Sequence, residues 1–207
     1  MTVIEKLASS LGRRDEEPNI ELAIQIVDHN DENAVKELIE NLTNKNKNIQ
    51  NDCIKVLYEI GDRKPSLISD YTNELFSLLE SRNNRIQWGA MTALNSITSD
   101  VPEIIYSNIQ KIIVAGDNGS VITKDQVVNI LIKLCSIKPY AEESFNLLIN
   151  QLVKSPTNQL PMYAERSMSI INEENKNLFI ETLTSRLEEI EKETKRKRIE
   201  MVIKKIR

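Results

Sequence analysis

Residues 49–65 read IQNDCIKVLYEIGDRKP and residues 86–102 read IQWGAMTALNSITSDVP, so the second stretch follows the first at a step of 37 residues. The same step continues along the chain in columns of similar residues. These columns are Cys53, Ala90, Val127 and Ala164; Leu57, Leu94, Leu131 and Met168; Ile60, Ile97, Leu134 and Ile171; Leu38, Leu75, Ile112 and Ile149; and Pro65, Pro102 and Pro139. Independent columns that agree on one period indicate a protein built from stacked repeats.

The apolar spacing within each repeat is helical. One stripe is formed by Ile49, Cys53, Val56, Leu57 and Ile60, and a second stripe, after the proline, by Leu67, Ile68, Tyr71, Leu75, Phe76 and Leu79. Residues spaced i, i+4, i+7, i+8 and i+11 share one face of an α-helix. Proline suits the first turn of the next helix, because the amide it lacks would have no partner there. The sequence therefore predicts an all-α fold of paired helices.

We expect a single repeat domain over residues 1–207. Residues 1–30 form an N-terminal cap with helices over 2–12 and 19–29, and residues 31–191 hold four helix pairs. Residues 192–207 contain eight basic and two acidic side chains and an apolar stripe that includes Ile199 and Ile203. We interpret this segment as a capping helix, the alternative being a basic patch for nucleic acid or acidic proteins.

The composition limits the classes of protein. Hydrophobic residues make up 40% and charged residues 28%, as in an ordinary folded domain, and five Gly and six Pro are too few for a turn-rich β-fold. The net charge of −4 argues against attraction of the whole surface to nucleic acid or anionic lipid. Two distant cysteines suggest no disulfide framework, and no apolar run is long enough to span a membrane. We expect a cytoplasmic location.

Residues 86–113, IQWGAMTALNSITSDVPEIIYSNIQKII, resemble a HEAT repeat, in which an Ala- and Leu-rich helix is followed by a helix often opened by proline. The resemblance extends over residues 20–191 and is to HEAT/armadillo-type proteins, especially prokaryotic HEAT-like ones. It implies an α-α superhelix, a right-handed solenoid, that binds a protein or, less often, nucleic acid. In that family the helix that corresponds to residues 49–60, the second of a pair that begins at residue 31, lines a concave groove.

Candidate binding residues follow from the helical phase. If the stripe from Ile49 to Ile60 faces the core, Asn51, Lys55 and Tyr58 point outward, and the step of 37 residues adds their equivalents. The predicted binding surface comprises Asn51, Lys55, Tyr58, Trp88, Thr92, Asn95, Asp125, Asn129, Met162 and Arg166. We expect Trp88 and Tyr58 to anchor a partner, and Lys55 and Arg166 to pair with its acidic groups. The alternative is that Trp88 only packs over the next repeat.

The leading hypothesis is a non-enzymatic interaction scaffold with a protein partner. We predict no catalytic residue, cofactor or metal: His29 is the single histidine and lies in a polar turn, and Cys53 occupies a core column. The alternative is a DNA-binding protein that resembles the HEAT-like alkylpurine DNA glycosylases, for which Trp88 and Asp125 lie on neighbouring repeats. A third hypothesis is a subunit that docks through other surfaces onto a larger complex.

Overall fold

The computed structural model describes residues 2–207, and within this range it contains helices and no strand. The chain divides into two compact units, Met1–Val127 and Val128–Arg207, with the boundary inside α8 (Val121–Cys135). The first unit holds η1 (Ile4–Lys6), α1 (Glu17–His29), α2 (Glu32–Glu40), η2 (Asn41–Thr43), α3 (Lys47–Arg63), η3 (Pro65–Leu67), η4 (Ser69–Tyr71), α4 (Thr72–Ser77), η5 (Leu78–Glu80), α5 (Asn84–Ile97), α6 (Pro102–Ser107) and α7 (Ile109–Asn118). The second holds η6 (Lys138–Tyr140), α9 (Ala141–Lys154), α10 (Leu160–Ser167), η7 (Met168–Ile170), α11 (Lys176–Ser185), η8 (Leu187–Glu189) and α12 (Glu193–Ile206).

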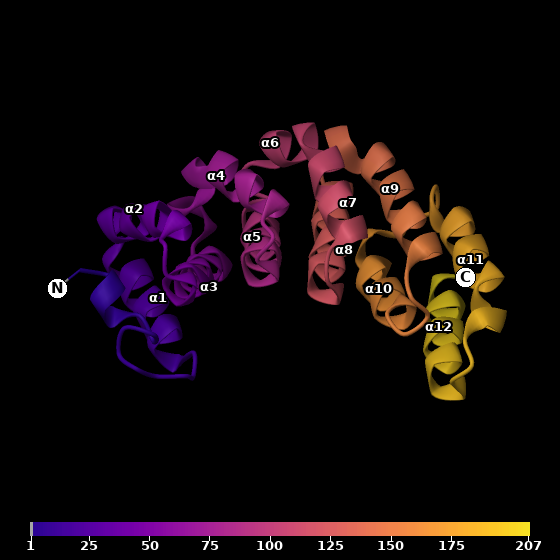
Figure 1. The fold of residues 1–207 in the computed structure, drawn as a ribbon. Helices are drawn as coiled ribbons and strands as arrows, with labels where there is room; N and C mark the ends of the chain where they lie inside the picture. Colours follow the sequence, from indigo (N-terminus) through magenta and orange to yellow (C-terminus); the bar gives the residue numbers. More distant parts are fainter. Residues whose placement is uncertain (1) are drawn as a thin grey trace. The chain divides into compact units, whose positions relative to one another are not determined.

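The first unit consists of two layers of helices (Figure 1). Helices α1, α3 and α5 pack side by side in one layer, which we call the inner layer. Helix α2 and the segment from η3 to η5 form the other, which we call the outer layer. The core lies between them. Two members of each of four predicted apolar columns are fully buried there: Cys53 and Ala90, Leu57 and Leu94, Ile60 and Ile97, and Leu38 and Leu75. The predicted all-α repeat fold is therefore confirmed, and its core columns are those that the 37-residue step indicates.

Helices α3, α5 and α8 begin at equivalent polar residues. Asn46 and Asn83 are the N-caps of α3 and α5, and their side chains accept hydrogen bonds from Asn48 N and Arg85 N. Ser120, one further step of 37 residues along, accepts a hydrogen bond from Thr123 N in the first turn of α8. Polar side chains at these positions satisfy amides that lack a helical partner. The polar breaks of the sequence are thus helix starts.

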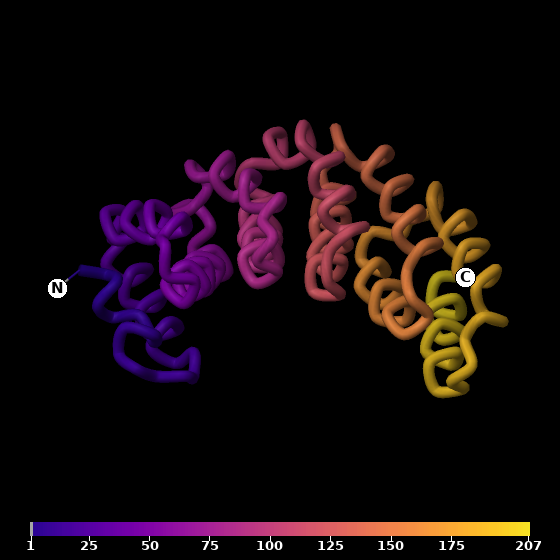
Figure 2. The backbone as a smooth tube through the Cα atoms, in the orientation of Figure 1, coloured from indigo at the N-terminus to yellow at the C-terminus, as the bar shows by residue number. Residues whose placement is uncertain are grey.

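The outer layer is less regular than the inner layer. Pro65, Pro102 and Pro139 each open a helical segment, as predicted, but the segment after Pro65 is divided into η3, η4, α4 and η5. The tube in Figure 2 follows this broken path along the outer layer of the first unit. Short 3₁₀ turns tighten a helix at its ends, and here they recur within one outer segment.

The prediction of a helix over residues 2–12 is wrong. Only η1 forms there, followed by turns up to Gly12, whose φ of +69° lies in the left-handed region. The amides of Ala8 and Ser9 donate to the side chains of Asn19 and Asp52, at 2.9 and 2.8 Å, instead of to a helical carbonyl. These side chains fix the turn against α1 and α3. The expected helix over 19–29 is present as α1.

The second unit repeats the two-layer arrangement. Helices α10 and α12 pack together, and α9 and α11 lie beside each other in the other layer (Figure 1). The buried Arg186 donates from Nη1 to Leu152 O at 2.8 Å and to Ser155 O at 2.7 Å, and so satisfies carbonyls at the end of α9. Met168 and Ile171, the last members of two columns, are only half-buried, because they lie in and just after the 3₁₀ helix η7.

Candidate protein-binding surface

Six of the ten candidate residues share one face of the first unit. Asn51, Lys55 and Tyr58 come from α3, and Trp88, Thr92 and Asn95 come from α5; we call this surface the α3–α5 face. Both helices belong to the inner layer and pack directly against each other. The face is therefore a continuous surface made by two neighbouring repeats.

Two glycines allow α3 and α5 to approach each other closely. A Cβ atom added at Gly89 would lie 2.7 Å from Cγ1 of the buried Ile54, and one added at Gly61 would clash with the Ser96 side chain. At both positions the added atom would lie closer to its neighbour than van der Waals contact allows, so a larger residue would push the two helices apart. The close packing sets the separation of the side chains on the α3–α5 face.

The two aromatic residues of the face form a pair across the helix–helix contact. The ring centroids of Tyr58 and Trp88 are 5.7 Å apart, with an angle of 46° between the ring planes. This distance is within the range that favours aromatic pairs. Both residues are half-buried, so the pair packs on the repeat and still presents surface to solvent. Trp88 therefore packs against the preceding repeat, not over the next one, and its role in binding stays a prediction.

Two cations lie over these rings. The Lys55 ammonium nitrogen is 4.8 Å from the Tyr58 ring centroid, and the Arg85 guanidinium carbon is 5.5 Å from the Trp88 ring centroid. Cations within about 6 Å of an aromatic face are attracted to its π electrons. The aromatic pair is thus flanked by positive charge on both sides.

The Lys55 side chain does not point outward to a partner, as the sequence predicted. Its side chain is 8% exposed, and its ammonium group contacts Glu59 at 2.7 Å and Glu16 at 3.2 Å. Burial is the largest single effect and would lower the pKa of Lys55, but the interactions with Glu59, Tyr58 and Glu16 together outweigh it and the pKa is raised. The side chain lies along the aromatic surface because a long aliphatic stem can be buried while its charged end finds a partner.

Arg85, Glu16 and Glu59 complete a network of charges that the sequence interpretation missed. Glu16 contacts both Lys55 and Arg85, while Glu59 pairs with Lys55 and Arg63. Burial raises the pKa of Glu16 and Glu59, and the hydrogen bonds from their cationic partners outweigh this effect and lower the pKa of both. Arg85 precedes Trp88 by three residues, so helical spacing could have identified it. Glu16 precedes α1 and has no periodic signal.

The polar candidates of the face also make contacts within the protein. Asn51 Oδ1 accepts a hydrogen bond from Asn83 Nδ2 at 2.9 Å, and Asn95 Nδ2 donates to Gln126 Oε1 at 2.8 Å. Thr92 Oγ1 donates to the Trp88 carbonyl oxygen. These bonds tie the face to the adjoining loop and to α8, and they leave the side chains half-exposed.

The remaining four candidates lie on α8 and α10. Asp125 belongs to the first unit and is half-buried. In the second unit, Arg166 Nη1 on α10 donates to Asn129 Oδ1 on α8 at 3.2 Å, across the predicted step of 37 residues. Met162 is half-buried on α10, and Arg166 is exposed. Asn129, Met162 and Arg166 are thus the candidate residues of the second unit.

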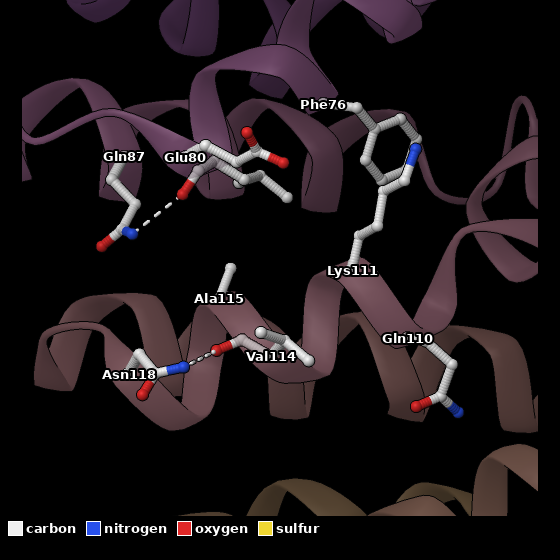
Figure 3. Close-up of a pocket in the computed structure, with 9 residues that line it drawn as sticks. Phe76, Glu80, Gln87, Gln110, Lys111, Val114, Ala115 and Asn118 are labelled. Atoms are coloured by element: carbon white, nitrogen blue, oxygen red, sulfur yellow. Dashed lines mark hydrogen bonds between the residues drawn. The ribbon is translucent and has the colours of Figure 1, made fainter.

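The hollows of the structure lie away from most candidate residues. Figure 3 shows one of about 400 Å³ between the end of α4–η5, the start of α5 and α7, with the Lys111 ammonium 5.9 Å from the Phe76 ring centroid. A hollow in the second unit includes Cys135, and burial raises the pKa of its thiol to about 12. A high thiol pKa disfavours the reactive thiolate.

In residues 2–207, no group of three or more His, Cys, Asp or Glu side chains is placed to hold a metal ion. Over the same residues, no helix combines the length and apolar character that a membrane span requires.

Comparison with solved structures shows the fold. A designed armadillo repeat protein in complex with the peptide (KR)4 has a TM-score of 0.66 and 15% identity, over 90% of this chain and 86% of that one. A computationally designed armadillo repeat protein for modular peptide recognition has a TM-score of 0.64 and 14% identity, over 90% and 87%. An engineered protein has a TM-score of 0.61 and 17% identity, over 100% and 99%. No family model and no curated protein matches the sequence. The fold is therefore of the HEAT/armadillo helical-repeat type.

Proposed function

We propose that the chain is a non-enzymatic scaffold whose α3–α5 face binds an extended segment of a partner protein. The observation that carries this proposal is the Tyr58–Trp88 pair, which is half-exposed at the contact of two repeats and flanked by Lys55 and Arg85. Large aromatic residues and arginine dominate the energetics of protein interfaces. The peptide that accompanies one structural neighbour supports the choice of a peptide-like partner.

The polar side chains of this surface suit an extended ligand. Asn51 lies seven residues before Tyr58 on α3, and Asn95 lies seven residues after Trp88 on α5. Both residues are half-exposed, so a segment that crosses the face passes polar groups as well as the aromatic pair. We expect a bound segment to cross α3 and α5 and to contact Trp88 and Tyr58 on the way. The second patch, with Asn129, Met162 and Arg166, is proposed to serve a partner in the same manner.

The DNA-binding alternative receives less support from the charges of this face. Lys55 and Arg85 are two cations set among the carboxylates Glu16 and Glu59, whereas binding of a phosphate backbone depends on many uncompensated cations along the surface. Binding of labelled single-stranded and duplex oligonucleotides measures this alternative directly. Tight, salt-sensitive binding that Trp88→Ala abolishes would favour it, and release of an alkylated base would favour the glycosylase form.

Selection of a random peptide library on the immobilised protein tests the proposed function. We expect enriched peptides whose affinity falls at least tenfold in Trp88→Ala and Tyr58→Ala, the loss typical of a central aromatic contact of about 1.4 kcal/mol or more. The matched control is Val114→Ala, because Val114 is 58% exposed on α7, in the outer layer. Peptides that depend on Val114 and ignore Trp88 and Tyr58 would show that a different surface binds the partner.

A further inference from the structure

Glu16 lies at a particular place on the α3–α5 face. It precedes α1 and reaches across to α3 and α5, where its Oε2 is 3.2 Å from Lys55 Nζ and its Oε1 accepts a hydrogen bond from Arg85 Nη2. The same two cations lie over the rings of Tyr58 and Trp88. A carboxylate from the protein itself therefore occupies the charged centre of the proposed binding surface.

The segment that carries Glu16 is exposed. Residues 10–15 are all exposed, Gly12 has a positive φ, and Arg13 forms its ion pairs with Asp15 and Glu17 within the same segment. The turn is tied to the protein by the amides of Ala8 and Ser9, which lie before this exposed stretch. Displacement of Glu16 thus leaves these anchoring bonds intact.

Arg85 retains unused capacity for a carboxylate. Its Nε is buried and has no hydrogen-bond partner among the described residues, while Nη2 donates to Glu16. A carboxylate that approaches in the guanidinium plane can accept from two nitrogens at once, an arrangement stronger than a single bond. A polar hollow of about 410 Å³ beside Arg85, lined also by Asn48, Asn51 and Arg14, gives such a group room to enter.

We propose that Lys55 and Arg85 form a subsite for a carboxylate of an acidic partner segment, and that Glu16 is an internal occupant that this segment displaces. This inference rests on the proposed function and specifies the partner class. When Glu16 leaves, the ion-pair network holds three cations, Lys55, Arg63 and Arg85, against the carboxylate of Glu59, a balance of +2 within the network. Two further arginines and two aspartates line the hollow beside Arg85, and their charges cancel. A basic segment would be repelled from this centre, and a neutral one would leave the charge uncompensated.

Competition with Glu16 predicts the effect of its removal. A site that is occupied internally binds its partner with an affinity reduced by the fraction of molecules in which the site is open. Replacing the Glu16 carboxylate by an amide raises this fraction. Glu16→Gln therefore strengthens the binding of an acidic peptide, whereas Asp15→Asn, which removes the neighbouring charge that pairs with Arg13, does not.

The experiment uses fluorescein-labelled octapeptides in which Ala alternates with Glu, Gln or Lys. Fluorescence anisotropy gives their affinities for the wild-type chain, Glu16→Gln, Asp15→Asn and the double variant Glu16→Gln/Arg85→Gln, at low and high salt. Unlabelled peptide is followed by the emission of Trp88, the single tryptophan, which lies in the subsite. Thermal unfolding of each variant verifies that it is folded.

We expect the Glu peptide to bind Glu16→Gln roughly tenfold more tightly than wild type, with a change in Trp88 emission and with strong weakening by salt. Asp15→Asn should match wild type, and Arg85→Gln should cancel the gain. Equal affinity of wild type and Glu16→Gln, an equal gain in Asp15→Asn, a gain that survives Arg85→Gln, preference for the Lys peptide, or no binding by any variant would each overturn the inference. Library peptides that depend on Trp88 but not on Glu16 would uphold the proposed function while overturning this inference.

Discussion

The ammonium group of Lys55 lies between the carboxylates of Glu59 and Glu16, and its stem is buried along Tyr58. Lys55→Ala removes both the packing of the stem and a hydrogen-bonded partner of Glu59, whose side chain is only 17% exposed. We expect a loss of about 1–3 kcal/mol in the free energy of unfolding, measured by urea denaturation. Lys36→Ala on the exposed surface of α2 is the control and should change stability by less than about 0.5 kcal/mol. Equal effects would mean that the Lys55 contacts contribute nothing.

The depressed pKa of Glu59 makes stability depend on pH in the acidic range. Its carboxyl has a lower pKa in the folded protein than its ordinary value of 4.5, so the unfolded chain binds more protons in this window. The contribution of Glu59 is therefore complete above pH 4.5 and is lost as the pH falls through the folded pKa. We expect Glu59→Gln to flatten the acid-side decline in unfolding free energy. In a Lys55→Ala background the same substitution should have a smaller effect, and an unchanged decline in both backgrounds would contradict this assignment.

At the scale of single residues, the sequence predicted burial better than it predicted contacts. Helical phase placed Cys53 and Leu57 in the core, because burial follows directly from the period of the apolar stripe. The same phase placed Lys55 outward, although an aromatic neighbour and two carboxylates hold it against the protein. One of these carboxylates, Glu16, comes from an irregular segment, and no periodic pattern indicates where such a segment folds back.

At the scale of helices, the contact of α3 with α5 depends on Gly89. Gly89→Ala would gain about 1 kcal/mol from helix propensity, but the new Cβ would lie 2.7 Å from Ile54 Cγ1 and 3.1 Å from Ile54 Cγ2. Overpacking of this kind costs about 1–3 kcal/mol, so we expect net destabilisation.

A double-mutant cycle isolates this contact. Ile54→Ala removes both atoms that the new Cβ would meet, so Gly89→Ala in that background should be neutral or stabilising in urea denaturation. An equal cost of Gly89→Ala in both backgrounds would show that the strain arises elsewhere in α5.

The sequence predicted where the helices begin, but it did not predict where a helical segment is divided into shorter pieces. Polar breaks and prolines marked where helices begin, since N-caps and first-turn prolines act through the local backbone. The division of the outer segment into η3, η4, α4 and η5 depends on how it packs over α3 and α5, which no local rule encodes. The absent helix over 2–12 has the same origin, because Asn19 and Asp52 bind its amides from other elements.

At the scale of the whole molecule, the repeat period predicted the fold class, because each helix pair must bury its stripe against the next. The division into Met1–Val127 and Val128–Arg207 has no counterpart in the 37-residue step, which continues through α8. A surface for a partner needs side chains from more than one repeat, as the Tyr58–Trp88 pair shows. Its chemical preference is set by charges such as Glu16 that lie outside the repeat pattern.

A stack of repeats also needs a helix that covers its terminal apolar surface, and we propose that α12 does this in the second unit. Ile199, Val202 and Ile203 are buried on α12, which packs against α10 and α11. We expect Ile199→Ala to destabilise the second unit by about 2–5 kcal/mol and to increase hydrogen exchange in α10 and α11. Met201→Ala, on the same helix but 55% exposed, is the matched control and should have little effect.

Replacement of the exposed Lys197, Lys204 and Lys205 by Glu should likewise preserve the protection of α10 and α11 from hydrogen exchange, since these side chains are not packed. If the charge reversals, and not Ile199→Ala, exposed α10 and α11 to exchange, α12 would be held by its charges and could not be regarded as an apolar cap.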